Sequence, residues 1–299
     1  MRGRTDDLMA RLASGGTLGD QDVAALAATT DILTLGMLAD EARRRKHGAE
    51  TTYVRVAEVS LVSAGEPITL PPAAREVRVR VEASSMPSTL KSLRAVVTAA
   101  GGVPVSACSL ADLQAHARAA GTPLADLLHA LRRAGVTSIA EAPIDLLDEP
   151  EAALDAVREA GLGLARLTVQ RQADAGTRLA LIRRAVDLQH ALGWLPSFAP
   201  LPRAWSAASP TTGYEDVRQV ALARLLADNI PSIQVDWSLY GPKLAQVALT
   251  VGADDLDAVP AVDDESEGRR RAPLEEVRRN IRAAALVPVE RDGAYGRIC

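Results

Sequence analysis

Short β-type segments alternate with amphipathic helical segments from residue 52 onward, and this alternation limits the folds that the chain can adopt. It is typical of a parallel sheet, because parallel neighbours need a long crossover that is usually a helix. Its regularity predicts an α/β fold, a complete or partial (β/α) barrel of the TIM type, better than an open sheet. The expected strands are 52–59, 77–83, 103–107, 137–141, 163–170, 194–199, 232–235 and 286–289, and the expected helices are 88–100, 109–118, 122–134, 151–160, 173–192, 214–229, 240–251 and 273–285.

The connection between the first two expected strands is abnormally short. Residues 60–76 contain Gly65, Pro67, Pro71 and Pro72, which leave room for little more than one helical turn. We therefore expect the barrel wall to be thin or open at this place.

Residues 1–50 are expected to form a separate N-terminal helical segment. Asp20 and Asp31 are candidate N-caps, and Gly48 follows a basic stretch that suits a helix C-terminus. The predicted domains are thus this segment and a barrel at 51–299 with a C-terminal helical extension.

Charge and hydrophobicity exclude two kinds of partner. With 34 basic and 38 acidic residues the net charge is −4, so no uniform positive field attracts nucleic acid. No apolar run is long enough to cross a membrane, and the first residues lack the apolar core of a signal peptide. We expect a cytoplasmic protein that binds neither nucleic acid nor membranes.

The chain has only two cysteines, Cys108 and Cys299. This number is too small for a disulfide scaffold, a four-thiolate zinc site or an iron–sulfur cluster held within one chain.

Several segments, taken together, resemble one family. They include Gln-Val-Asp-Trp-Ser-Leu-Tyr-Gly-Pro-Lys-Leu-Ala-Gln at 234–246 and Val-Pro-Val-Glu-Arg-Asp-Gly-Ala-Tyr at 287–295. The chain is similar to the radical S-adenosylmethionine enzymes of the futalosine route to menaquinone, aminofutalosine synthase and cyclic dehypoxanthine futalosine synthase, and to their deazaflavin-forming relatives. Further similar segments are 38–54, 104–113, 124–135, 221–231 and 249–257.

The chain departs from this family where the family's chemistry begins. The resemblance implies a loop after the first strand in which three cysteines hold a four-iron cluster, but residues 60–69 contain no cysteine. The stretch 81–87 stands where the family has a Gly-Gly loop near S-adenosylmethionine. We therefore expect no 4Fe-4S cluster and no functional radical enzyme, and these changes argue against S-adenosylmethionine binding.

Polar residues remain where the expected strands end, which is where barrel enzymes carry their sites. Glu82, Asp145 and Asp236 are candidate catalytic acids or bases, although such carboxylates also cap helices or pair with arginines. Ser84, Arg166, Gln234 and Trp237 are candidate substrate-binding residues, and Trp237 could equally lie in the core. The four histidines show no metal-ligand spacing, so no metal site is expected.

Two hypotheses of function follow. The first is a non-radical binding, regulatory or partner protein related to menaquinone biosynthesis, a pseudoenzyme that holds a nucleoside-like small molecule or associates with a pathway enzyme. The alternative is a cluster-independent hydrolase or lyase that acts on a futalosine-like nucleoside or a related carboxylated molecule. A thin barrel wall would also favour a homo-oligomer or another protein partner.

Overall fold

The strands form a closed parallel barrel in the computed structural model, which describes residues 7–11, 14, 16, 18–61, 68–81, 86–204, 212–262 and 273–298. β1 to β4 pair in sequence order, β4 pairs with both β5 and β6, β6 to β9 continue the order, and the last barrel strand, β9, returns to pair with β1. A short irregularity divides the fifth position of the barrel into β5 and β6. In order, the strands are β1 (Glu50–Ser60), β2 (Glu76–Arg80), β3 (Val105–Ser109), β4 (Ser138–Pro143), β5 (Gly163–Leu164), β6 (Leu167–Val169), β7 (Ser197–Pro202), β8 (Ser232–Asp236) and β9 (Asp255–Pro260).

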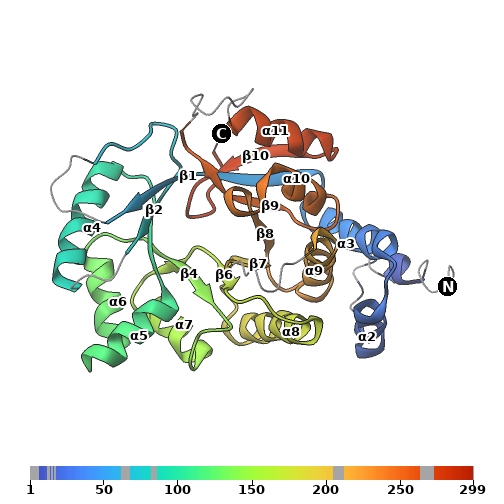
Figure 1. Ribbon diagram of the computed structural model, residues 1–299, viewed down its shortest axis with the longest axis horizontal. Coiled ribbons are helices and arrows are strands. Elements are labelled where there is room, and N and C mark those ends of the chain that lie inside the picture. Colours follow the sequence, from blue (N-terminus) through green and yellow to red (C-terminus); the bar gives the residue numbers. More distant parts are fainter. Residues whose placement is uncertain are drawn as a thin grey trace.

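Helices surround this barrel on its outer side (Figure 1). Their apolar faces pack against the outer face of the sheet, with residues such as Leu93 and Leu131 fully buried. In the described residues, every helix is too short or too polar to cross a bilayer. The helices are α2 (Asp20–Ala28), α3 (Ile32–His47), α4 (Met86–Ala100), α5 (Leu110–Ala120), α6 (Leu124–Arg133), α7 (Pro150–Glu159), α8 (Ala175–Leu192), α9 (Gly213–Leu226), α10 (Trp237–Leu249) and α11 (Pro273–Ala283).

The fold predicted from the sequence is confirmed, and each expected element from residue 52 on begins and ends within three residues of an observed one. One strand was missed. β9, which closes the barrel, contains Asp255 and Asp257, and two aspartates in six residues are unfavourable in a strand on sequence grounds alone. Both side chains face arginines in the barrel interior, and these ion pairs account for the exception.

The expectation of an open wall between β1 and β2 is wrong. β2 pairs with β1 over five residues and with β3 on its other side. The connection itself holds no helix in its described parts, residues 61 and 68–75.

The N-terminal helices show one predicted cap and one correction. Asp31 caps α3, because its Oδ1 accepts the amide of Thr34 at 3.1 Å. The N-cap of α2 is Gly19 rather than Asp20, and Asp22 accepts the Gly19 amide.

The lower end of the barrel, at the amino ends of the strands, is filled from the C-terminal part of the chain. β10 (Val287–Arg291) pairs with the first half of β1, and the turn that follows brings Tyr295 inside the barrel. The Tyr295 hydroxyl donates to the carbonyl of Ala165 at 2.5 Å, and burial raises its pKa to about 12. Arg291 binds Asp255 with two hydrogen bonds of 2.6 and 2.7 Å and stacks on the Tyr295 ring. This end of the barrel is therefore a packed floor.

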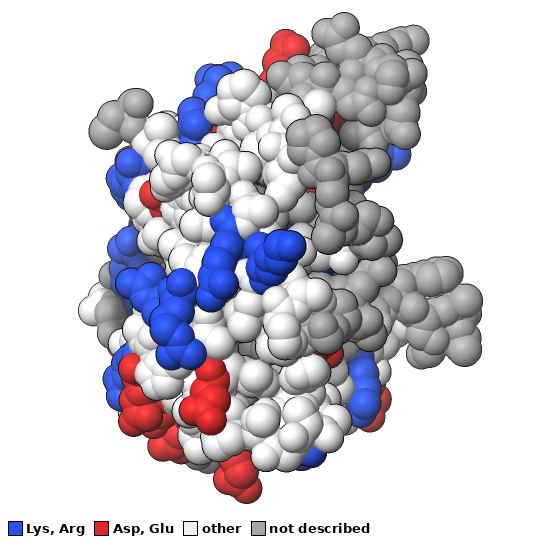
Figure 2. Space-filling model, turned by 90° about the vertical axis from the view of Figure 1, so that its left-hand side faces the viewer, with Lys and Arg blue, Asp and Glu red and all other residues white. Residues whose placement is uncertain are grey.

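Charge is unevenly spread over the outside of the barrel. Figure 2 shows the face at the left of Figure 1, where basic side chains gather at mid-height and acidic ones below them. Neither sign covers that face.

Candidate functional site

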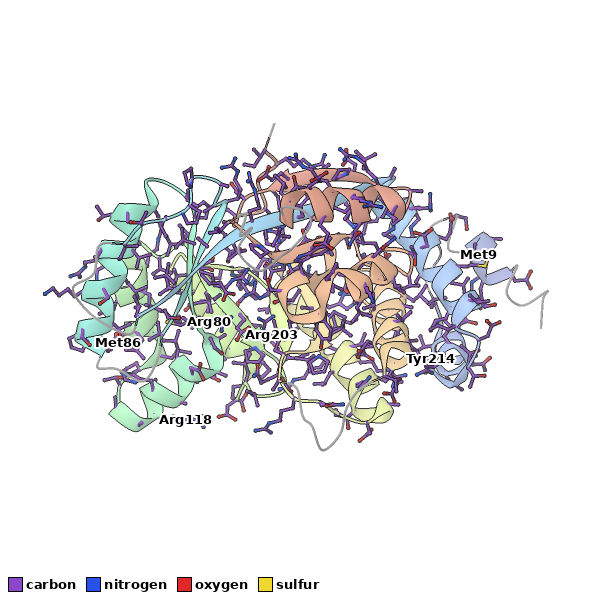
Figure 3. All side chains as sticks on the ribbon, turned by 45° about the horizontal axis from the view of Figure 1, so that its top comes forward. Met9, Arg80, Met86, Arg118, Arg203 and Tyr214 are labelled. Carbon is purple, nitrogen blue, oxygen red and sulfur yellow. The ribbon has the colours of Figure 1, made fainter. Side chains whose placement is uncertain are left out.

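A cavity of about 840 Å³ opens at the carboxyl ends of the strands. Its lining comes from β1, β2, β3, β4 and β8, from the break between β5 and β6, from residues after β6 and β7, and from α4, α5 and α10. In Figure 3, Arg80 and Arg203 lie on the barrel side of this region, and Met86 lies farther out on α4. Charged and apolar side chains share the wall, as in many small-molecule sites.

Two buried arginines, Arg78 from β2 and Arg166 from the break between β5 and β6, form the floor of the cavity. Arg78 donates from Nε and Nη2 to Glu76, at 3.0 and 3.2 Å, and from Nη2 to Asp257 Oδ1 at 2.7 Å. Arg166 Nη1 pairs with the other oxygen of Asp257, at 2.5 Å. Asp257 therefore bridges the two arginines from across the barrel.

The surroundings of these groups shift their pKa values in opposite directions. Asp257 has a pKa well below its usual range, because the attraction of Arg166 and Arg78 outweighs the effect of burial. Arg78 faces two carboxylates, which raise its pKa in spite of burial. Burial and the neighbouring charge of Arg78 lower the pKa of Arg166. The pKa of Arg166 is therefore lowered although it is paired with Asp257.

Arg203, just after β7, crosses the cavity wall between two carboxylates. Its Nε lies 2.7 Å from Glu141 Oε2, and its Nη1 lies 3.1 Å from Asp236 Oδ2. Asp236 is also the N-cap of α10, since its Oδ1 accepts the amide of Leu239 at 2.8 Å. This clasp ties together the ends of β4, β7 and β8.

A cysteine and an aspartate lie on the α5 side of the cavity. Cys108 has a positive φ of 63°, and burial together with the charge of Asp112 raises the pKa of its thiol to about 12. Asp112 is exposed at the cavity mouth, and its pKa is raised by partial burial and by the charge of Glu141. A left-handed backbone at a non-glycine residue is strained and is common at functional sites.

Two of the residues predicted from the sequence line the cavity, namely Asp236 and Arg166. Asp145 does not converge with them: its two oxygens accept the amides of Gln170 and Arg171 at 2.8 and 2.7 Å, so it fastens the loop after β6. Both oxygens of Asp145 are thus engaged by the backbone of this loop.

The remaining predicted residues lie elsewhere. Gln234 is deep in the barrel, where its amide nitrogen donates to Asp255 at 2.6 Å, and Trp237 is buried in the first turn of α10. Neither is part of the cavity lining. Glu82 and Ser84 lie outside the described residues.

Several residues that shape the site were missed from the sequence. Arg78 could have been found, because Glu76 and Arg78 have the two-residue spacing of one strand face. Glu141 lies at the end of an expected strand. Nothing local in the sequence indicates that Asp112 and Arg203 lie beside Glu141, or that Asp257 pairs with Arg78. In the described ranges, no group of three or more His, Cys, Asp and Glu side chains could hold a metal ion.

Comparison with known proteins finds sequence similarity between this chain and several enzymes. Residues 199–297 match the family model of the CofH/MqnC C-terminal region. Aminodeoxyfutalosine synthase from Thermus thermophilus is 27% identical over 100% of this chain and 98% of its own length. The 5-amino-6-(D-ribitylamino)uracil–L-tyrosine 4-hydroxyphenyl transferase from Methanosphaerula palustris is 25% identical over 87% of this chain and 88% of its own. Cyclic dehypoxanthine futalosine synthase from Streptomyces coelicolor is 25% identical over 62% of this chain and 52% of its own.

Solved structures share the fold at much lower identity. Methylornithine synthase (PylB) superposes with a TM-score of 0.66 and 11% identity over 94% of this chain and 97% of its own. The FeFe-hydrogenase maturase HydG from Carboxydothermus hydrogenoformans gives a TM-score of 0.62 and 13% identity over 96% of this chain and 79% of its own.

Proposed function

We propose that this chain, a homologue of aminodeoxyfutalosine synthase and cyclic dehypoxanthine futalosine synthase, binds a small molecule in its barrel mouth without radical chemistry. Its role is that of a binding, regulatory or partner protein related to menaquinone formation by the futalosine route. Two observations together support the proposal. The barrel mouth holds a cavity lined by charged side chains, and residues 60–69, which follow β1, contain no cysteine.

The residues present do not fit the four-iron cluster that the resemblance implies. Such clusters are held by cysteine thiolates, and residues 60–69, after β1, contain none. Cys108 is a single buried thiol, and one thiolate cannot replace the three that the resemblance implies. Cluster chemistry therefore has no part in the proposed function.

The cavity supports ligand binding instead. Its wall joins Arg78, Arg166 and Arg203 to apolar side chains such as Met86 and Leu239. Hydrogen bonds and ion pairs hold all three arginines in place, so little ordering is needed when a ligand enters. A nucleoside-like or carboxylated molecule fits these surroundings.

A second candidate, a cluster-independent hydrolase or lyase, is favoured by one pair of residues. Asp112 and Glu141 both line the cavity, and partial burial together with the charge of Glu141 raises the pKa of Asp112, which is the direction that a general acid needs. Asp236 is less suited to this role, because Leu239 and Arg203 already occupy its oxygens. Turnover of a futalosine-like nucleoside that is lost in Asp112→Asn would favour this candidate over pure binding.

Anaerobic reconstitution with iron and sulfide tests the main proposal. We expect no stoichiometric iron and no 5′-deoxyadenosine after reduction with S-adenosylmethionine. A thermal-shift screen over S-adenosylmethionine, adenosine, futalosine and chorismate-derived carboxylates then tests the binding role. A bound cluster with 5′-deoxyadenosine formation would overturn the proposal.

Association with another chain is also proposed and has its own test. Large apolar side chains, Leu33 and Met37 on α3 and Val247 on α10, are exposed, and such surface often meets a partner. Light scattering on the purified protein measures self-association, and a monomer at all concentrations would remove the homo-oligomer from the proposal.

A further inference from the structure

Three arginines surround one carboxylate on the wall of the barrel, away from its mouth. Glu290 on β10 receives Arg55 of β1 and Arg75, which precedes β2, on the same oxygen: their Nε atoms lie 2.7 and 3.3 Å from Oε1. Arg278 on α11, the helix that lies over β10 (Figure 1), brings its Nη2 to 3.8 Å from Oε2. The lining of the barrel-mouth cavity includes none of these four described residues.

This arginine cluster lies beside the connection that lacks a crossover helix. A regular barrel has a helix after each strand, whereas residues 61 and 68–75, the described parts of the β1–β2 connection, contain none. The side chains of Arg75 and Arg278 are 31% and 41% exposed, so a solute can reach them. Those of Arg55 and Glu290 are 12% and 10% exposed and lie deeper.

The arginine cluster carries a surplus of two positive charges, because a single carboxylate faces three guanidinium groups. Other acidic side chains nearby in the sequence do not offset this surplus. Asp292 accepts the amides of Ala294 and Gly296, at 2.8 and 2.7 Å. Glu275, three residues before Arg278 on α11, is exposed and forms no ion pair with the described arginines of the cluster. Like charges held this close repel one another, so an anion placed among them would be stabilising.

Unused donors remain on the two exposed arginines. Arg278 donates its Nε to the Tyr53 hydroxyl at 2.9 Å, and its guanidinium lies 5.9 Å from the centroid of the Tyr53 ring. The Arg75 amide donates to the carbonyl of Arg55 at 2.8 Å, and its carbonyl accepts the amide of Gly293 at 2.9 Å. Within the described residues, Nη2 of Arg75 and both Nη atoms of Arg278 donate no hydrogen bond. The two side chains are therefore anchored and still have donors for an outside acceptor, which keeps the ordering cost of binding small.

We propose that the arginine cluster binds a phosphate dianion, either free phosphate or the phosphate group of a small monoester. A dianion offsets the two surplus charges, and the planar fork of arginine matches the oxygens of phosphate. Arg75 and Arg278 contact the phosphate, and Arg55 adds its charge from deeper in the wall. The inference goes beyond the proposed function and does not depend on it, because the site lies outside the barrel-mouth cavity.

Other anions suit the arginine cluster less well. A carboxylate, a sulfate ester or a phosphodiester carries one negative charge and leaves one positive charge of the cluster without compensation. A carboxylate also presents two acceptor oxygens, whereas a phosphate monoester presents three. The site therefore selects for the doubly charged group.

Phenyl phosphate and phenyl sulfate test this selection on the wild-type protein. They are nearly equal in shape but differ by one charge at pH 8, because the second pKa of a phosphate monoester is about 6. In ligand-observed NMR titrations at low salt we expect phenyl phosphate to bind at least about fivefold more tightly than phenyl sulfate. Equal affinity for the two, or no binding of phenyl phosphate and inorganic phosphate at about 10 mM, would overturn the inference.

Inorganic phosphate, titrated in the same way, distinguishes the two sources of the ligand. An affinity equal to that of phenyl phosphate would support the site and assign free phosphate to it. A weaker affinity would support the site and assign a monoester, because the organic group then contributes to binding.

Two substitutions on one helix locate the binding site. Arg278→Gln removes an arginine of the cluster, and Arg282→Gln removes the same charge from an exposed side chain one turn farther along α11. We expect Arg278→Gln to lose about tenfold in affinity for phenyl phosphate and Arg282→Gln to stay within about twofold of the wild type. Equal affinities in the two variants would refute the location, since the change would then report net charge alone or binding elsewhere. Circular dichroism checks that both variants fold, and if Arg278→Gln does not, the wild-type comparison decides.

Discussion

Replacing Asp257 by asparagine tests whether the charges inside the barrel depend on one another. Asp257 is 1% exposed and holds Arg78 at 2.7 Å and Arg166 on its other oxygen. Asparagine keeps the volume but leaves Arg166 as a buried cation with no carboxylate partner among the described residues. Breaking a buried ion pair on one side costs about 3–5 kcal/mol, and we expect the free energy of unfolding to fall by about 4 kcal/mol.

Urea denaturation measures this loss, and thermal unfolding gives a second reading. An unfolding entropy of about 2.1 cal/mol/K per residue amounts to roughly 0.6 kcal/mol/K for 299 residues, so Tm should fall by about 6 °C. Asp155→Asn is the control, because the Asp155–Arg158 pair is exposed and contributes at most about 0.5 kcal/mol. The double variant Asp257→Asn, Arg166→Met removes both charges and should recover at least half of the loss. A loss below about 1 kcal/mol, or no recovery in the double variant, would refute the reasoning.

Three further predictions concern other parts of the fold. Gly252→Ala should cost at least about 2 kcal/mol in urea denaturation, because Gly252 has a φ of 112° and a Cβ there would lie 2.7 Å from the Cβ of Arg224; a loss under 0.5 kcal/mol would contradict this. His47 has a pKa lowered to about 4, mainly by burial, so the unfolded chain binds its proton first as pH falls; because the imidazole is partly exposed, on the order of 1–2 kcal/mol of stability should be lost between pH 6.5 and 4. The same pH titration on His47→Asn should be flatter, and an unchanged slope would exclude His47 as the cause. In Cys299→Ser, which leaves Cys108 as the only cysteine, iodoacetamide at pH 8 should modify the folded protein at least about 1000-fold more slowly than the urea-unfolded protein; similar rates would show that the thiol is accessible and ionised.

The sequence predicted the barrel well because its outer layer follows simple periodicity. Strand segments such as 163–170 and helices such as 88–100 carry apolar residues at the spacing of their element, and burial of those residues on the outer face of the sheet decides the fold. β9 was missed because its two aspartates are stabilised by arginines that lie far away in the sequence, Arg78 and Arg291.

The site was only partly predictable for a similar reason. Position at a strand end was enough to select Asp236 and Arg166, which line the cavity. It also selected Asp145, whose carboxylate accepts two backbone amides from the loop after β6. No local sequence pattern distinguishes a strand-end residue that lines the cavity from one that binds a loop. The clasp of Arg203 joins three segments that only the closed barrel brings together.

The pairing of β1 with β9 and β10 has a consequence for how the protein is made. Thr52 meets Asp255 across 203 residues of chain, and Tyr295 enters the interior from still later in the sequence. While the ribosome is still synthesising this region, β1 has a neighbour on neither side of its first half, and the interior arginine Arg291 has not been added. Closure must therefore wait until residues 255–295 have been synthesised, and a nascent chain stalled near residue 250 would expose an unpaired strand edge of the kind that chaperones protect.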